Sequence, residues 1–382
     1  MTLLSKERIN LMLNRQVINI LLKVTHQTNK RKRAVVQKNF KWQLPIQYSV
    51  SGLLNIFIIQ QALAHISLYT CLTFHPQIFH VRDNKGFNYV RTFNCHSTSG
   101  PYDEDGNFDN NIQLSTECEH KLGVVQQLTA RMLGLQSPHN RPDRNKYVTI
   151  NETNIKISAR HLFEIYNTTY IDTYGLEYDY GSALHFFHND YSNNYKSVII
   201  PKVKEYLYMM GQQSSLSFAD YKLLNMHYCS SKCPKAKSID CKNGGYQNPN
   251  NCGICICPRG YTGILCDQPL RNTFLCGSGV INADANVNMI YMQDIATCSF
   301  MITSAVNTTI SLTIVESSME YAMPCYESVG IDIKYKADKS ATGLCLCGYH
   351  TDVNLVSDDN QILIVYNGKK RENKLIFTYQ QQ

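Results

Sequence analysis

The distribution of cysteine constrains this chain more than any other feature of its sequence. The 382 residues include fifteen cysteines, and seven of them fall between Cys229 and Cys266. A segment of about forty residues has too little apolar surface for a core of its own and needs covalent cross-links. The density therefore indicates an oxidising compartment and a small disulfide-rich module. Three Asn-x-Thr sequons agree with secretion and predict N-linked glycans at Asn151, Asn167 and Asn307.

Length and charge restrict the remaining possibilities. A chain of 382 residues predicts two or three domains, and its 43% hydrophobic content allows a large core. The net charge of +7 is a mild excess, without a basic stripe interleaved with aromatic residues, so nucleic-acid binding is not expected. No run reaches the ~20 apolar residues that a transmembrane helix needs. The apolar run Leu53–Ile66 is interrupted by glutamine and histidine, and it predicts a buried amphipathic helix at about Ile56–Thr70.

The N-terminal residues 1–33 are expected to form a leader or propeptide-like segment ending in Arg31-Lys32-Arg33. That basic run resembles a furin-type cleavage site, and a solvated charge run explains it equally well. The apolar stretch Val17–Val24 is broken by Lys23 and makes a poor signal peptide. The chain therefore either starts internally to the gene product or uses an atypical leader.

The stretch Gly123–Arg144 reads GVVQQLTARMLGLQSPHNRPDR. Its Gly123, its Leu-Gly-Leu around Gly134 and its final Arg-Pro-Asp-Arg resemble the active-site helix of the astacin metalloproteases, G-x-x-x-H-E-x-x-H-x-x-G-x-x-H-E-x-x-R-P-D-R. In that pattern three histidines bind a catalytic zinc ion, and the glutamate after the first histidine activates the zinc-bound water.

This resemblance assigns the three zinc-ligand positions to Gln127, Arg131 and Ser137, and the general-base position to Leu128. Gln offers a weak neutral oxygen, Arg carries a permanent positive charge, and un-ionised Ser is a poor ligand. Leu128 cannot abstract a proton. The sequence therefore predicts that no zinc cofactor is bound, although zinc is the metal of the family, and that the catalytic centre has been dismantled.

The stretch Tyr178–Phe186, YDYGSALHF, resembles the family's Met-turn, Y-D-Y-x-S-x-M-H-Y. The Met and the second catalytic Tyr of that turn correspond to Leu184 and Phe186, and Phe186 lacks the phenolic oxygen. Pro138 stands where the family has a Glu that pairs with the new N-terminus after activation. Tyr147-Val-Thr-Ile150 and the strand-like segments 42–48, 71–74 and 112–115 extend the resemblance over residues 34–229.

Two alternatives concern the altered site. His120, His139, His185 and His188 lie near it in sequence and could rebuild a metal site. Arg131 either enters the former zinc position, where it could hold a carboxylate, or turns to solvent as an ordinary helix residue. The second interpretation of Arg131 is the more common behaviour of such residues.

Residues 230–268 resemble an EGF-like module. The segment begins with Cys-x-Asn-Gly-Gly at Cys241 and ends with C-x-C-x-x-G-x-x-G-x-x-C over Cys255–Cys266. Its glycines allow the tight turns of a small hairpin. A zinc knuckle is the alternative interpretation, because Cys-x-Cys pairs also bind zinc.

Residues 276–380 resemble a CUB domain, which is a β-sandwich. Cys276-Gly opens the segment, and Thr308–Glu316, Ile362–Tyr366 and Leu375–Tyr379 have the pattern of strands. Calcium binding is not carried over, because Tyr326-Glu327 stands where many CUB domains have a Tyr-Asp pair.

Spacing alone leaves fifteen connectivities for six cysteines. The family resemblances imply seven disulfides: Cys71–Cys229, Cys95–Cys118, Cys233–Cys252, Cys241–Cys255, Cys257–Cys266, Cys276–Cys298 and Cys325–Cys347. Cys345 is left over, and it could exchange roles with Cys347.

The predicted architecture is α+β: a leader, an astacin-like peptidase domain, a disulfide-rich EGF-like module and an all-β CUB sandwich, as in the nematode astacins in particular. The implied function is a secreted, extracellular and catalytically inactive homologue that binds extracellular proteins or matrix through the EGF and CUB modules. The alternative is an active zinc metalloendopeptidase that cleaves extracellular proteins. A decaying gene product is a third hypothesis, which the intact cysteines oppose.

Overall fold

The computed structural model describes residues 41–82, 85–100, 110–167 and 171–382. The predicted leader at 1–33 and its basic cleavage site lie outside these residues. None of the helices in the described ranges is long and apolar enough to cross a membrane.

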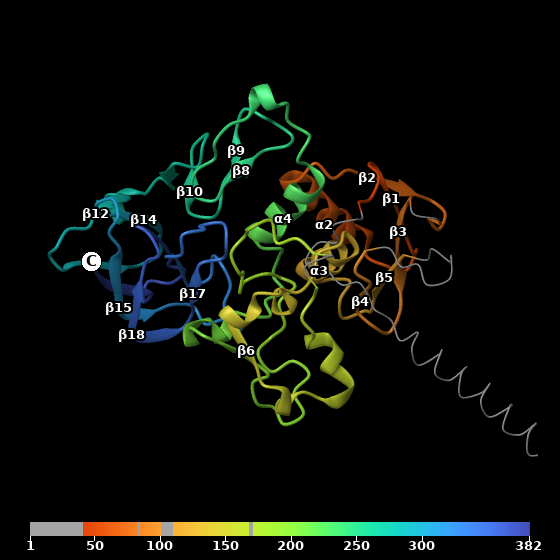
Figure 1. Ribbon diagram of the computed structural model, residues 1–382, viewed down its shortest axis with the longest axis horizontal. Helices are drawn as coiled ribbons and strands as arrows, with labels where there is room; N and C mark the ends of the chain where they lie inside the picture. Colours follow the sequence, from red (N-terminus) through yellow and green to blue (C-terminus); the bar gives the residue numbers. More distant parts are fainter. Residues whose placement is uncertain (1–40, 83–84, 101–109, 168–170) are drawn as a thin grey trace, which may run out of the picture. The chain divides into compact units, whose positions relative to one another are not determined.

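The first part of the chain builds a five-stranded sheet in the order β2-β1-β3-β5-β4 (Figure 1). Its strands are β1 (Ile46–Val50), β2 (Phe74–Gln77), β3 (Gly86–Arg91), β4 (His96–Ser97) and β5 (Asn111–Leu114). All neighbours run parallel except β4 and β5. Strands were predicted from Trp42 and from Cys71, and both predictions begin too early. Pro45 has no N–H for the ladder, so pairing starts at Ile46.

Two helices pack on this sheet and share its core (Figure 1). The helix predicted at Ile56–Thr70 is confirmed by α2 (Ile56–Tyr69), which Asn55 caps by accepting a hydrogen bond from the backbone N–H of Ile58. Its buried stripe recurs at helical spacing: Ile59, Ala62, Leu63 and Ile66. The second helix, α3 (Leu122–Met132), is buried along most of its length. Trp42 packs at the C-terminal end of α3, where its indole N–H donates a hydrogen bond to the carbonyl of Met132 at 2.9 Å.

The second half of this domain has little regular structure. Strands β6 (Val148–Ile150) and β7 (Ile199–Pro201) pair antiparallel. Short 3-10 helices connect them to the rest: η2 (Pro138–Asn140), η3 (Arg144–Lys146), η4 (Glu152–Asn154), η5 (Ile157–Phe163) and η6 (Lys204–Tyr208). The domain ends in α4 (Phe218–Tyr228), which starts with a capping box between Ser217 and Asp220. Cys229 directly follows α4 and bonds to Cys71, so one disulfide closes a loop of 158 residues.

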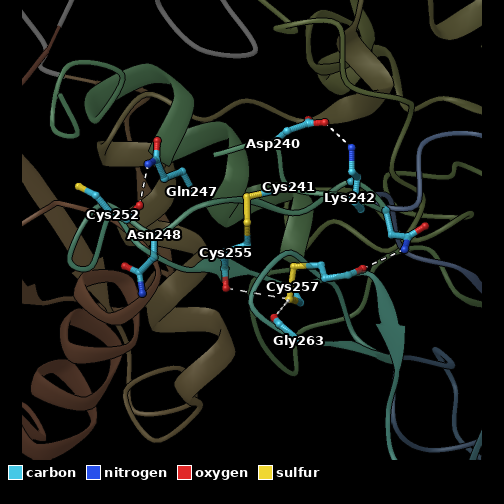
Figure 2. Close-up of a disulfide and its surroundings, with 12 residues drawn as sticks. Asp240, Cys241, Lys242, Gln247, Asn248, Cys252, Cys255, Cys257 and Gly263 are labelled. Atoms are coloured by element: carbon cyan, nitrogen blue, oxygen red, sulfur yellow. Dashed lines mark hydrogen bonds and ion pairs between the residues drawn. A yellow bond between two sulfur atoms is a disulfide. The ribbon is translucent and has the colours of Figure 1, made fainter. Parts of the chain in front are cut away.

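The next segment is a small module held by three disulfides, Cys233–Cys252, Cys241–Cys255 and Cys257–Cys266. Figure 2 shows the Cys241–Cys255 disulfide and its surroundings. Its regular structure consists of η7 (Lys235–Lys237) and two short hairpins, β8 (Tyr246–Gln247) with β9 (Cys255–Ile256) and β10 (Tyr261–Thr262) with β11 (Gln268–Pro269). Only five hydrophobic residues form its buried cluster, and two of these, Leu363 and Val365, come from the sandwich that follows. The disulfides therefore supply what a core cannot.

The C-terminal part is a sandwich of two sheets, in the orders β12-β14-β19-β16-β17 and β13-β20-β15-β18. After η8 (Phe274–Cys276) the strands are β12 (Val280–Asn282), β13 (Asn288–Gln293), β14 (Thr297–Thr303), β15 (Ile310–Ser318), β16 (Ile331–Lys334), β17 (Leu344–Leu346), β18 (Tyr349–Val356), β19 (Gln361–Asn367) and β20 (Lys374–Gln381). The three strands predicted here are confirmed by β15, β19 and β20. Disulfides Cys276–Cys298 and Cys325–Cys347 lie in this part, and Cys95–Cys118 lies in the first domain. Cys345 remains a buried thiol.

The sandwich and the second half of the first domain share one apolar cluster. The backbone N–H of Cys325 donates to the carbonyl of Tyr208 at 2.8 Å, and the N–H of Thr342 donates to the carboxylate of Asp179 at 3.1 Å. The disulfide-rich module is joined to both neighbours, since Lys222 donates to the carbonyl of Gly244 and Gln361 donates to Asn243. The three modules between residues 41 and 382 thus make direct polar contacts with one another.

Candidate active site

The helix α3 is held in place by two glycines. A Cβ atom on Gly123 would lie 2.2 Å from the carbonyl oxygen of Gln213, so only glycine fits where α3 passes this loop. Gly134 has φ +100°, which ends the helix in a left-handed turn. Its N–H donates to Arg131, and the N–H of Leu135 donates to Ala130, both at 2.9 Å. This is the Schellman pattern. It turns the chain sharply towards Ser137.

The faces of α3 separate the residues at the predicted ligand and base positions. Gln127 and Arg131 are half-buried and lie one turn apart, so they share a face of the helix. Leu128 is only 6% exposed and belongs to the same apolar cluster as Leu184, which is fully buried. The structure therefore uses Leu128 as a core side chain.

The remaining predicted positions are closed off by packing. Ser137 is 3% exposed and precedes η2, but its hydroxyl makes no capping hydrogen bond. Phe186 contributes to an aromatic cluster: its ring centroid lies 4.2 Å from that of His139, 5.2 Å from that of Tyr191 and 5.7 Å from that of Phe163. The half-buried Phe186 thus packs against other aromatic rings.

Of the histidines proposed to rebuild a metal site, His139 and His185 do lie together, with ring centroids 5.4 Å apart. Burial lowers the pKa of His185 to about 4 and places that of His139 well below its usual value, so both rings are neutral at pH 7. His185 Nδ1 faces the carbonyl of Phe186 at 2.8 Å, and its Nε2 faces the Tyr178 hydroxyl at 2.7 Å. A neutral ring donates through Nδ1 to that carbonyl and accepts through Nε2, which leaves no lone pair for a metal.

The other two histidines have separate partners. His120 contacts Asn55 and lies 3.3 Å from the Glu119 carboxylate, and His188 contacts Ser197 at 3.0 Å. Across the described ranges, no group of three or more His, Cys, Asp or Glu side chains is arranged to hold a metal ion.

Arg131 does not behave as a simple surface residue. Burial is the main cause that lowers the pKa of His96 and of His139, and the charge of Arg131 adds to it, at His139 after those of His185 and Arg144. The side chain is half-buried, so it is not the fully solvent-exposed residue of the second interpretation.

The Arg-Pro-Asp-Arg block has a structural role. Arg141 forms a two-pronged ion pair with Asp143, at 2.9 and 2.8 Å, and also donates to the carbonyls of Leu176 and Glu177. Arg144 donates to the carbonyl of His139 at 2.7 Å. These bonds fix the loop after η2 against the Met-turn segment whether or not a metal is bound.

The family described as astacin, peptidase family M12A, matches residues 34–229, just over half of the chain. The chain belongs to the astacin family. Its fold is α+β, with an astacin-like domain, a disulfide-rich segment and an all-β sandwich of two sheets.

Several curated astacins are similar over most of this chain. Zinc metalloproteinase nas-34 of Caenorhabditis elegans is 28% identical over 332 residues, which is 86% of this chain and 54% of the relative. Zinc metalloproteinase dpy-31 of Brugia malayi is 28% identical over 349 residues, 86% of this chain and 56% of the relative. The chain thus spans about half the length of these relatives. Among solved structures, high choriolytic enzyme 1, a hatching enzyme zinc-protease from the medaka Oryzias latipes, matches 49% of this chain and 94% of its own, with 21% identity and a TM-score of 0.43.

One pair of buried carboxylates was missed at the sequence level. Asp179 and Asp220 both bond to Ser217, at 2.6 and 3.0 Å, and Asp220 also accepts from Ser182 at 2.7 Å. Asp179 reaches Thr342 in the sandwich. Asp179 lies in the Met-turn motif, which the sequence shows. No local signal in the sequence points to its partner Thr342, 163 residues away.

Proposed function

We propose that this astacin is a secreted pseudoenzyme that acts by binding extracellular proteins or matrix through its EGF-like and CUB modules. The observation that carries the proposal is the chemistry of the predicted ligand set. Gln127, Arg131 and Ser137 offer no imidazole, and the base position holds a leucine built into the core. Arg131 also brings a permanent positive charge to one of these ligand positions, which opposes the binding of a cation there. The residues present do not fit a zinc ion, and no catalytic step is derived through one.

An extracellular setting is supported by covalent chemistry. Fourteen of the fifteen cysteines are joined in disulfides, a state that persists in oxidising compartments. Asn307 is exposed on a turn with φ +65°, where a glycan meets no packing obstacle, and Asn151 is half-buried. The sequon at Asn167 extends into residues outside the described ranges.

An active zinc metalloendopeptidase remains the second candidate, because the curated relatives carry that name. The two candidates differ in hydrolysis. The secreted chain should leave casein and gelatin intact in the presence of zinc. Hydrolysis that 1,10-phenanthroline abolishes would favour the second candidate.

The assignment of the ligand positions is tested with a repaired chain, which needs no insertion because the spacing around Gly134 is kept. It carries Gln127→His, Leu128→Glu, Arg131→His, Ser137→His, Leu184→Met and Phe186→Tyr. This variant should take up zinc, since its ligand set is that of a catalytic site with an open position. A folded repaired chain that takes up no zinc would contradict the assignment of these positions.

The sandwich offers a surface suited to protein binding. Among the described strands, β13 pairs only with β20, so it forms an edge of its sheet. Met289 and Tyr291 on β13 point outward and are 67% and 53% exposed. An edge strand with outward apolar side chains can accept a strand or an apolar surface of a partner.

Binding is tested with the full secreted chain on a decellularised extracellular matrix. The chain should be retained, and the double variant Met289→Lys with Tyr291→Ala should lose most of that retention. Tyr349→Ala is the matched control, because Tyr349 is 67% exposed on β18, the opposite edge of the same sheet. Equal loss in both variants, or no retention of the wild type, would contradict the proposal.

A further inference from the structure

The three modules meet around a cavity of about 490 Å³. The astacin domain contributes Tyr69 of α2 and Tyr221 of α4, the disulfide-rich module contributes Arg259, and the sandwich contributes Tyr326 and Glu327. Ligand sites commonly have volumes of 300–1,000 Å³ and lie where domains meet. This cavity is separate from the altered active site, because none of the predicted zinc-ligand positions lines it.

Close packing between the modules fixes the shape of the cavity before any ligand binds. A Cβ atom on Gly181 would lie 2.5 Å from the side chain of Thr342, and one on Gly260 would lie 2.5 Å from a methyl group of Leu363. Only glycine allows the astacin domain and the disulfide-rich module to approach the sandwich this closely. The hydrogen bond from Thr342 to Asp179 adds a polar contact at the same place.

The charges in the lining are already paired. The Nε of Arg259 lies 3.2 Å from the Asp332 carboxylate, and its Nη2 donates to Asn367 at 2.7 Å. Glu327 lies 3.2 Å from the Lys334 ammonium. A charged ligand would therefore have to compete with existing ion pairs. The chemistry of the cavity favours a ligand without net charge.

Much of the remaining lining consists of aromatic rings and serine hydroxyl groups, together with the apolar side chains of Leu216, Pro258 and Leu270. The rings of Tyr69 and Tyr221 stack with centroids 4.6 Å apart, and Tyr69 and Tyr326 are both half-buried. Ser214, Ser215 and Ser328 line the same cavity. Aromatic faces suit apolar C–H surfaces, and hydroxyl groups both donate and accept hydrogen bonds.

We propose that this cavity binds a short neutral oligosaccharide. Such a molecule has apolar ring faces, many hydroxyl groups and no charge, which are the three properties that the lining selects. An extended peptide is disfavoured because peptide recognition of that kind uses an open strand edge. Tyr261, in the two-residue strand β10, is the only lining residue of the described chain that lies in a strand.

The test is calorimetric titration of the full chain with two probes, the β-1,4-linked trimers of N-acetylglucosamine and of glucose. At least one should bind saturably below about 10 mM. Tyr326→Ala should weaken that binding roughly fivefold, the effect of losing one well-packed aromatic contact of about 1 kcal/mol. Tyr321→Ala is the matched control, because Tyr321 is 72% exposed and absent from the lining. Tyr69→Ala provides a second variant in another module if Tyr326→Ala does not fold.

Three results would overturn the proposal: no saturable binding of either trimer, equal weakening by Tyr326→Ala and Tyr321→Ala, or tighter binding of a sulfated trisaccharide or a tripeptide. The outcome is independent of zinc content, so failure here leaves the pseudoenzyme proposal standing.

Discussion

Replacing Leu128 by glutamate restores the family's general base and should strongly destabilise the fold. Leu128 is 6% exposed within the apolar cluster of the first domain. Removing a buried leucine from its environment forfeits about 1.5–3 kcal/mol of burial. Placing an unpaired carboxyl group there costs about another 1–3 kcal/mol even if the group is neutral. The expected loss in the free energy of unfolding is thus about 2.5–6 kcal/mol.

This loss is measured by thermal unfolding followed by circular dichroism. For a domain of 150–250 residues, 1 kcal/mol shifts the melting temperature by about 2–4 °C, so Leu128→Glu should melt roughly 10–20 °C lower than the wild type. The neighbouring Gln127→Glu is the matched control: it adds the same carboxyl group on the half-buried face and should shift melting by only a few degrees.

The pH dependence gives this prediction a second readout. Burial raises the pKa of the new carboxyl group above its unfolded value, so the folded state binds its proton more tightly. The destabilisation by Leu128→Glu should therefore be smaller at pH 4 than at pH 7.5. Equal melting temperatures for Leu128→Glu and Gln127→Glu would refute the conclusion that Leu128 is a core residue.

Two further predictions concern stability. Removing the Cys71–Cys229 disulfide by changing both cysteines to serine should lower the free energy of unfolding by up to about 5 kcal/mol, because that bond closes a 158-residue loop. An unchanged denaturant unfolding curve would contradict this prediction. Cys345→Ser, which breaks no disulfide, is the control. Burial, followed by the charge of Asp179, raises the pKa of Asp220 to about 6, so its stabilising contribution is complete below about pH 4 and is lost as pH rises through 6. Asp220→Asn should reduce the change in the free energy of unfolding between pH 4 and pH 7 by at most about 3 kcal/mol. Parallel profiles of unfolding free energy against pH for wild type and variant would contradict the raised pKa of Asp220.

The features that the sequence predicts well are those fixed by local chemistry. Gly134 takes a positive φ, which few residues other than glycine adopt readily, and Asn55 caps a helix whose apolar spacing is visible in the sequence. The strand predicted from Trp42 begins four residues too early, because Trp42 packs against the end of α3, 90 positions away, and pairing starts at Ile46. Alternation cannot distinguish a strand from a loop that buries one large side chain.

The parts of the site that the sequence could not predict depend on side-chain contacts that form only in the folded chain. Leu128 reads as a lost base in the family pattern, but only the structure shows it as part of the core. His139 and His185 were candidate ligands by proximity, and the Tyr178 hydroxyl that occupies the lone pair of His185 became apparent only in three dimensions. The cavity requires side chains from α2 to Glu327, so no single segment carries a signal for it.

The most direct test of the central claim is the zinc content of the full secreted chain, purified without chelators, dialysed and analysed by plasma mass spectrometry. The predicted result is far less than one zinc per chain, because the altered site offers no set of metal-binding side chains and the cysteines of the disulfide-rich module are oxidised. One zinc per chain that survives dialysis would contradict the account.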